Sequence, residues 1–116
     1  MMFGDRIREL RKGFDLTLRE LAQQVGIDFT YLSKIENGHG PAPAESTIRR
    51  IASALNTDAE ELIILANKLP IDFERDLLER PPNHVAELYR SMAGKQYSDD
   101  EWQQILELLR DSGARS

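Results

Sequence analysis

Apolar residues recur at intervals of three and four positions along most of this chain, a spacing that is typical of amphipathic helices. In the first half, the spacing predicts five short helices, at about residues 3–12, 17–25, 28–37, 45–55 and 57–65. Gly13 and Gly26 end the first two helices, and a loop rich in glycine and proline at residues 39–43 follows the third. Helices this short and this close together predict one compact all-α domain over residues 1–69.

Polar motifs mark where several of these helices begin. Residues 17–20, 57–60 and 98–101 read TLRE, TDAE and SDDE, and each is typical of a capping box. In a capping box, a hydroxyl and a carboxylate satisfy the free amides of the first turn. Asp28 is expected to cap the helix over 28–37.

The remaining residues, 70–116, predict a smaller helical region. Pro70 marks its start, and the apolar pattern predicts helices over about 71–79, over about 83–93 and from residue 98 onwards. The last residues, 112–116, read as a frayed tail.

The last predicted helix carries one apolar face, formed by Trp102, Ile105, Leu106 and Leu109. A face of this size has little to pack against within so short a segment. It can pair two copies of the chain, fold back on residues 1–69 or bind another protein. We favour the pairing of two copies, which predicts a homodimer.

Composition narrows the range of functions. The chain has no cysteine and two histidines that lie far apart, so we expect no disulfide, no metal site and no cofactor. We find no Ser/His/Asp arrangement and no glycine-rich phosphate loop, so we expect no enzymatic activity. No apolar run is long enough to span a bilayer and no signal peptide is evident, so we expect a cytoplasmic protein without a membrane partner.

The net charge of −5 is unevenly distributed. Residues 1–55 carry 8 basic and 7 acidic side chains, whereas residues 56–116 carry 7 basic and 13 acidic ones. The acidic excess therefore lies outside the first four predicted helices, which leaves them free to approach a phosphate backbone.

Two of those helices, over residues 16–38, form a pattern with a specific use. A short helix, a tight turn at Gly26 and a second short helix predict a helix-turn-helix, which places its second helix in the major groove of DNA. Residues 3–69 also resemble the Cro/repressor-type helix-turn-helix family, often called XRE-like. The resemblance is carried, in order, by IRELRK, LTLRELAQQVGI, YLSKIENG, TIRRIASALN and DAEEL.

The resemblance implies a five-helix, lambda-repressor-like domain that is usually dimeric and reads DNA with the helix over about 28–37. By position it implies base-reading roles for Phe29, Thr30, Ser33 and Lys34, and phosphate contacts for Thr17, Arg19, Asn37 and His39. Two positions depart from the family pattern. Phe29 is aromatic where a polar residue is common, and it either packs on a thymine methyl or faces protein. Leu18 replaces a glutamine that would hold a phosphate.

For other charged and aromatic side chains, a structural role is an alternative to a DNA contact. The resemblance pairs Arg11 with Glu36 as an ion pair between the first and third helices. Tyr31 is expected in the core or at its edge, with a phosphate contact as the alternative. Arg49 and Arg50 either flank the DNA backbone or form a solvated helix face.

These observations predict a sequence-specific transcription regulator, in the first instance a repressor, that binds a two-fold operator in double-stranded DNA as a dimer. The region 70–116 loosely resembles the C-terminal part of repressors that a partner metallopeptidase cleaves. The alternative is an antitoxin that also regulates its own operon, because the acidic second half could cover a basic toxin.

Overall fold

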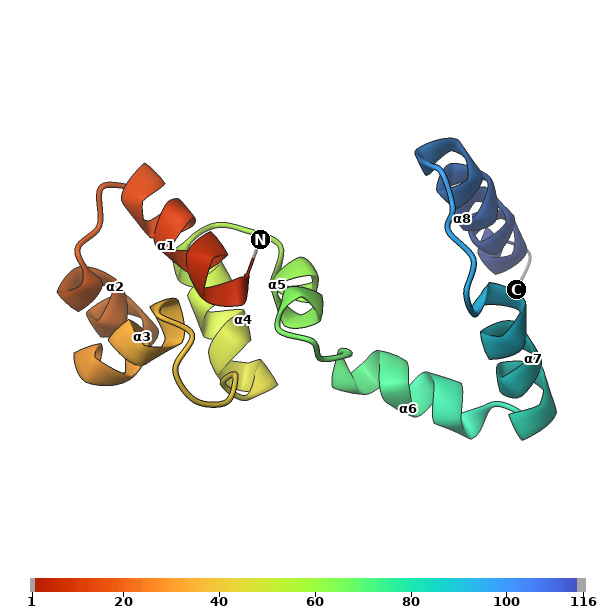
Figure 1. The fold of residues 1–116 in the computed structure, drawn as a ribbon, viewed down its shortest axis with the longest axis horizontal. Coiled ribbons are helices and arrows are strands. Elements are labelled where there is room, and N and C mark those ends of the chain that lie inside the picture. Colours follow the sequence, from red (N-terminus) through yellow and green to blue (C-terminus); the bar gives the residue numbers. More distant parts are fainter. Residues whose placement is uncertain (1, 115–116) are drawn as a thin grey trace. The chain divides into compact units, whose positions relative to one another are not determined.

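The computed structural model describes the backbone of residues 2–114 and the side chains of residues 2–111. Within these residues all regular structure is helical, so the all-α class is confirmed (Figure 1). The chain forms two compact units, unit 1 over residues 1–77 and unit 2 over residues 78–116. The helices are α1 (Phe3–Gly13), α2 (Leu18–Val25), α3 (Phe29–Glu36), α4 (Glu45–Ala54), α5 (Ala59–Leu65), α6 (Ile71–Glu79), α7 (Pro82–Met92) and α8 (Asp99–Ala114).

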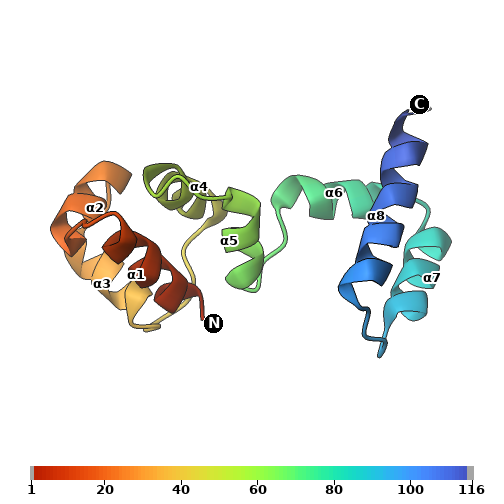
Figure 2. The same ribbon diagram turned by 90° about the horizontal axis from the view of Figure 1, so that it is seen from above.

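Helices α1 to α5 enclose the core of unit 1, and Figures 1 and 2 show them gathered around one another. One buried cluster joins α1 to α4 through Ile7, Leu21, Leu32 and Ile51, and a second joins α4 to α5 through Ile48, Ala52, Leu62 and Ile63. Phe3 packs against both clusters. Burial of each leucine or isoleucine among them contributes about 1.5–3 kcal/mol, and so the packing of unit 1 fixes its five helices relative to one another.

The predicted capping motifs are partly correct. In the box at the start of α2, Glu20 donates its amide to the Thr17 hydroxyl at 3.1 Å, and the Thr17 amide donates to the Glu20 carboxylate at 3.0 Å. The box at the start of α8 forms in the same way between Ser98 and Glu101. Asp28 does occupy the N-cap position of α3, but its side chain makes no capping bond there.

The predicted box at residues 57–60 is wrong by one residue. Helix α5 begins at Ala59, and Asp58 is its N-cap, with a side chain that accepts from the Glu61 amide at 3.0 Å. Thr57 is unavailable for this role because its own amide donates to the Ala52 carbonyl at 3.0 Å and completes the end of α4. Asp58 is therefore the first residue free to begin the next helix.

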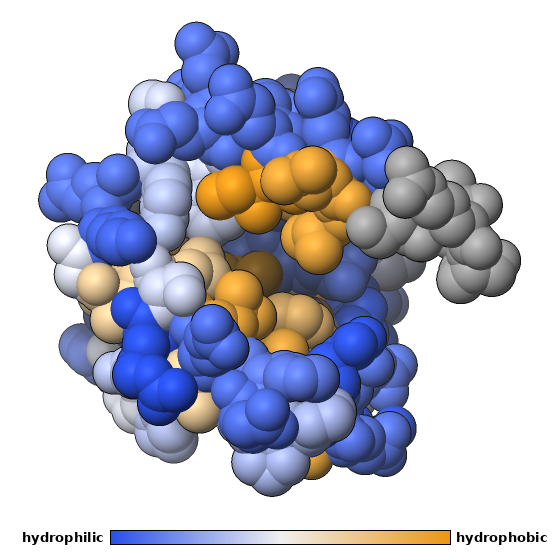
Figure 3. Space-filling model, turned by 90° about the vertical axis from the view of Figure 1, so that its right-hand side faces the viewer, coloured by the Kyte–Doolittle hydropathy of each residue, from blue (hydrophilic) through white to orange (hydrophobic). Residues whose placement is uncertain are grey.

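Unit 2 has no comparable core. Among its described side chains, residues 78–111, none is buried, and Val85, Ala86, Tyr97 and Ile105 are only half-buried. Apolar side chains gather on its surface between hydrophilic ones (Figure 3). The helix α8 continues to Ala114, so the prediction of a frayed tail was wrong for 112–114, and 115–116 lie outside the described residues.

In the described part of the chain, every helix is too short or too polar to cross a membrane.

Candidate nucleic-acid interface

The angle between α2 and α3 is set by small and apolar residues on their facing sides. Leu21, Ala22 and Val25 of α2 and Leu32 and Ile35 of α3 are all buried in the same cluster. Between the helices, Gly26 adopts φ +80°, a left-handed conformation that glycine accepts without strain. The amides of residues 26 and 27 both donate to the Ala22 carbonyl, at 2.9 and 3.0 Å, and close the turn.

A side chain from α4 completes this turn. Arg50 donates through Nη1 to the Val25 carbonyl at 3.1 Å, which satisfies an oxygen at the C-terminus of α2. Its second terminal nitrogen, Nη2, donates to the Thr47 hydroxyl at 3.3 Å. Arg49, in contrast, pairs with Glu45 on its own helix at 3.2 Å. Arg50 therefore holds the helix-turn-helix in shape, a role that the sequence pattern did not indicate.

The expected base-reading residues lie along α3 and are open to solvent. Phe29 is 37% exposed, Thr30 and Lys34 are exposed, and Ser33 is half-buried. Tyr31 is 39% exposed, so it does not lie inside the core, although more than half of the side chain is covered. Tyr31 lies four residues before the buried Ile35 and therefore on the same side of α3 as that residue. The outer surface of α3 is thus free to meet a ligand.

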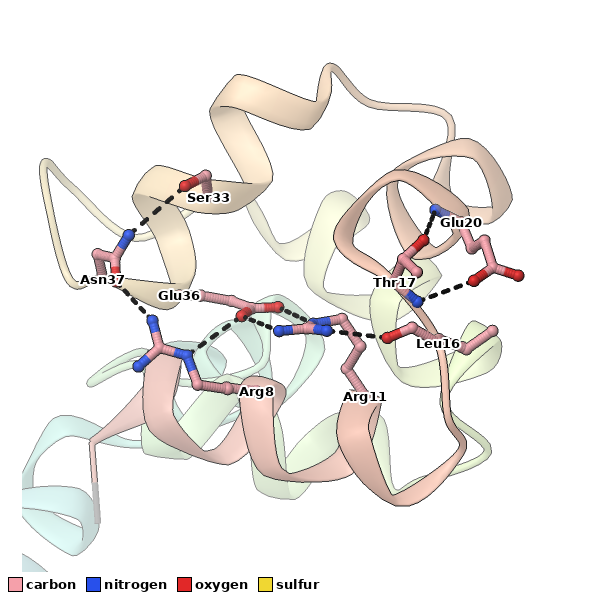
Figure 4. A network of polar contacts seen from close by, with 8 residues as sticks. All are labelled: Arg8, Arg11, Leu16, Thr17, Glu20, Ser33, Glu36 and Asn37. Carbon is pink, nitrogen blue, oxygen red and sulfur yellow. Dashed lines mark hydrogen bonds and ion pairs between the residues drawn. The ribbon is translucent and has the colours of Figure 1, made fainter.

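The C-terminus of α3 is fixed to α1 by a buried ion pair (Figure 4). The Glu36 side chain is 1% exposed and that of Arg11 11%. Arg11 donates to Glu36 through Nε at 2.7 Å and through Nη2 at 3.0 Å, a two-point contact. Arg11 also donates through Nη1 to the Leu16 carbonyl at 2.8 Å, just before α2. One arginine therefore joins α3 to the chain that leads into α2.

Two further residues of α1 take part, and sequence reasoning missed both. Arg8 donates to Glu36 at 3.4 Å and also to the Asn37 side-chain oxygen (Figure 4). Gly4 is buried against the backbone carbonyls of Ile35 and Glu36, where a Cβ atom would not fit. The spacing of Arg8 and Arg11, one helical turn apart, was a usable signal for the first of these.

The side chains expected to contact phosphate differ in how far their polar atoms are already bonded within the protein. The side-chain oxygen of Asn37 accepts a hydrogen bond from Arg8. Its side-chain nitrogen makes only a long bond to the Ser33 hydroxyl, at 3.5 Å, and can therefore donate to a phosphate. The Thr17 hydroxyl accepts from the Glu20 amide at 3.1 Å. His39 is exposed in the loop, and its amide donates to the Lys34 carbonyl at 2.9 Å.

Arg19 and Phe29 are brought together across the turn. The guanidinium carbon of Arg19 lies 4.5 Å from the centre of the Phe29 ring, within the range of a cation–π interaction. Glu20, the neighbouring carboxylate, is engaged with the start of α2, and its bonds to the Thr17 amide and hydroxyl lower the Glu20 pKa. Leu18 packs on the core, which explains why a phosphate-binding side chain is absent there.

The expected partner face of α8 is open in unit 2. Trp102 and Leu106 are each 40% exposed and Leu109 is 65% exposed, while Ile105 is half-buried. Trp102 meets Tyr97 edge to face, with ring centres 5.5 Å apart and an interplanar angle of 62°. The bonds from Ser98 at the start of α8 lower the Glu101 pKa.

Comparison with known proteins agrees with this arrangement. A family model described as helix-turn-helix, HTH_3, matches residues 7–62. The chain is 34% identical over 91 residues to the uncharacterized HTH-type transcriptional regulator RghRB of Bacillus subtilis (strain 168), covering 77% of this chain and 65% of that protein. It is 30% identical over 111 residues to the HTH-type transcriptional repressor RghR of the same organism, covering 89% and 78%.

A third relative connects sequence and structure. The HTH-type transcriptional regulator SinR of Bacillus subtilis (strain 168) is 28% identical over 75 residues, covering 65% of this chain and 68% of SinR. Among solved structures, one chain of a SinR protein/SinI protein complex matches with a TM-score of 0.52 and 22% identity. That match covers 97% of this chain and 99% of the other, and it supports the helical fold.

Proposed function

The chain belongs to the helix-turn-helix family of XRE-type transcriptional regulators, and from that premise we propose that it represses transcription by binding a two-fold operator as a dimer. The observation that carries the proposal is α3 itself. Its inner side is fixed by the core and by the Arg11–Glu36 pair, while its outer side is exposed. A rigid helix with free polar side chains is what reading of the major groove requires.

In this proposal, α3 reads the bases. Lys34 donates to guanine O6 or N7, and Thr30 bonds a base or touches a thymine methyl. Ser33 and Phe29 complete the reading surface, with Phe29 packing against a thymine methyl. Phe29 and Thr30 lie in the first turn of α3, the part of a recognition helix that meets base edges, and Ser33 and Lys34 follow one turn later.

Phosphate contacts orient the domain on DNA. We assign them to Thr17 at the start of α2 and to Asn37 and His39 after α3. Amides at the start of a helix and flexible polar side chains are typical phosphate donors. The bond from Arg8 to the side-chain oxygen of Asn37 supports this assignment, because it turns the side-chain NH2 group of Asn37 into the group that is available to donate.

The dimer is formed by unit 2. Its apolar face on α8, comprising Trp102, Ile105, Leu106 and Leu109, has no core of its own to enter. A second copy of the same face would cover it, as symmetric dimers do. Two copies place two recognition helices in successive major grooves, about 34 Å apart.

Selection of bound duplexes from a random DNA library tests the proposal. The full chain is expected to enrich a two-fold sequence whose half-sites lie one helical turn apart. Replacement of both Thr30 and Lys34 by alanine should weaken binding to that sequence by about 1–3 kcal/mol for each base-specific bond that the change removes. Lys68→Ala removes an exposed lysine of unit 1 outside α2 and α3, and is the matched control. Unchanged affinity in the double variant would contradict the assignment of α3.

A further inference from the structure

Arg19 and Phe29 form a pair that neither the capping of α2 nor the core explains. Arg19 is the second residue of α2 and Phe29 is the first residue of α3. Both side chains are exposed, so their contact contributes little to burial in unit 1. The Arg19 guanidinium nevertheless lies over the Phe29 ring, 4.5 Å from its centre.

The contact decides where the Arg19 charge lies. A free arginine at the start of α2 would extend toward the DNA backbone, as the family resemblance implies. Stacking on Phe29 instead holds the guanidinium beside the first turn of α3, the part of the recognition helix that meets base edges. No carboxylate among the described residues pairs with Arg19, and Glu20 is occupied by Thr17.

The chemistry of a stacked guanidinium suits base recognition. A guanidinium that lies flat on a ring uses the face of its plane and leaves its N–H donors, which lie in that plane, free to bind. Two parallel N–H donors match O6 and N7 of guanine, the commonest specific contact in the major groove. Because the ring holds the plane in place, less side-chain freedom is given up when the guanidinium binds a base.

We infer that Arg19 is a base-reading residue that recognises a guanine in each half-site, and that Phe29 positions it by stacking. This inference rests on the proposed function, because it requires α3 to lie in the major groove. Arg19 then adds a fifth reader to the four on α3 and takes no part in phosphate binding.

The substitution R19K tests this inference in the full chain, because lysine keeps the charge but loses the planar fork. The probes are the duplex selected by the wild-type protein, the same duplex with each guanine replaced in turn by 7-deazaguanine, and a scrambled duplex of equal length. Wild-type binding should weaken at one guanine of each half-site when its N7 is removed. R19K should bind the selected duplex about 5- to 150-fold more weakly, which corresponds to one bidentate base contact. It should bind the scrambled duplex as the wild-type protein does.

F29L tests the role of the ring, because leucine keeps an apolar side chain without a π face. F29L should lose the same guanine preference as R19K, and the variant carrying both changes should lose little more. Thermal unfolding followed by circular dichroism should be unchanged in all three variants, since both residues are exposed. Retention of the guanine preference by F29L would overturn the positioning role of Phe29.

The results separate this inference from the proposed function. If Arg19 binds a phosphate instead, R19A will weaken binding to the selected and scrambled duplexes equally and lower the salt slope by about one. That outcome, or unchanged preference for guanine in R19K, would overturn the base-reading role and leave the proposed function intact. Failure of the wild-type protein to select any sequence would overturn both.

Discussion

Unit 1 and unit 2 are both built from short amphipathic helices, but only unit 1 buries them. The twelve side chains that form the buried hydrophobic core of the described residues, from Ile7 to Ile63, all belong to unit 1. In unit 2, the tryptophan and the five leucines are at least 40% exposed. The difference teaches that an apolar pattern predicts a helix equally well in both regions, whereas burial depends on how many helices are present to cover one another.

This contrast has a functional meaning. In the proposed function α3 is a recognition helix, which must be rigid, and α3 is held by packing on its inner side and by Glu36 at its end. An association surface must be open before its partner arrives, and the face of α8 is open. The following predictions test this contrast, beginning with the largest expected effect.

Truncation of a core leucine should affect unit 1 far more than the same change affects unit 2. Leu32 has no solvent exposure, and Leu32→Ala should lower the free energy of unfolding by about 2–5 kcal/mol, because it leaves a cavity. Leu108, which is 70% exposed, is the matched control, and Leu108→Ala should change stability by less than about 0.5 kcal/mol. Urea unfolding followed by circular dichroism measures both. Equal losses would contradict the contrast between the units.

Removal of the buried Glu36 charge at the end of α3 should have the second-largest effect on stability. Glu36→Gln weakens two charge-assisted bonds from Arg11 and should cost about 1–3 kcal/mol of unfolding free energy. Glu9 forms an exposed pair with Arg6 at 2.8 Å, so Glu9→Gln should cost less than about 1 kcal/mol. The same denaturation measurement compares the two. A larger effect at Glu9 would show that the buried pair does not hold α3.

Association of unit 2 should depend on which side of α8 is altered. Leu109 and Leu108 are adjacent and similarly exposed, at 65% and 70%, but only Leu109 belongs to the proposed dimer face. Leu109→Ala should weaken the dimer by about 1–2 kcal/mol, close to the transfer free energy of a buried leucine. Leu108→Ala should leave the dimer unchanged. Sedimentation equilibrium measures the dissociation constants, and equal constants would exclude this face as the dimer surface.

The smallest expected effect is a pH dependence common to both units. The pKa values of Glu20 and Glu101 are lowered from about 4.5 by bonds within their capping boxes, so the unfolded chain binds protons more readily at these positions. The stability that these two ionised carboxylates contribute is fully present above about pH 4.5, and it is lost as the pH falls through their lowered pKa values. Glu20→Gln and Glu101→Gln should each flatten the acid limb of a thermal-unfolding profile. An unchanged acid limb in both variants would contradict the capping role.

The local sequence predicted much of unit 1. Helical spacing located the helices, and TLRE and Gly26 located the start of α2 and its end, because caps and turns depend on neighbouring residues. The ion pair of Arg11 and Glu36 was reached through the family resemblance.

Contacts between distant residues were harder to predict. Three contacts depend on tertiary packing, which periodicity does not encode. They are the bond from Arg50 of α4 to the end of α2, the packing of Gly4 against the end of α3, and the contact of Arg19 with Phe29. Thr57 was misassigned as a cap because it already completes α4.

The central claim is that unit 1 reads DNA and unit 2 joins two copies. Deletion of residues 98–116 removes α8 and leaves the core of unit 1 complete, so sedimentation of this variant and of the full chain, alone and with the selected duplex, tests the claim most directly. We predict that the full chain is a dimer that binds one duplex, and that the deletion variant is a monomer that binds the same sequence more weakly. A deletion variant that remains dimeric and binds the duplex as tightly as the full chain would contradict the claim.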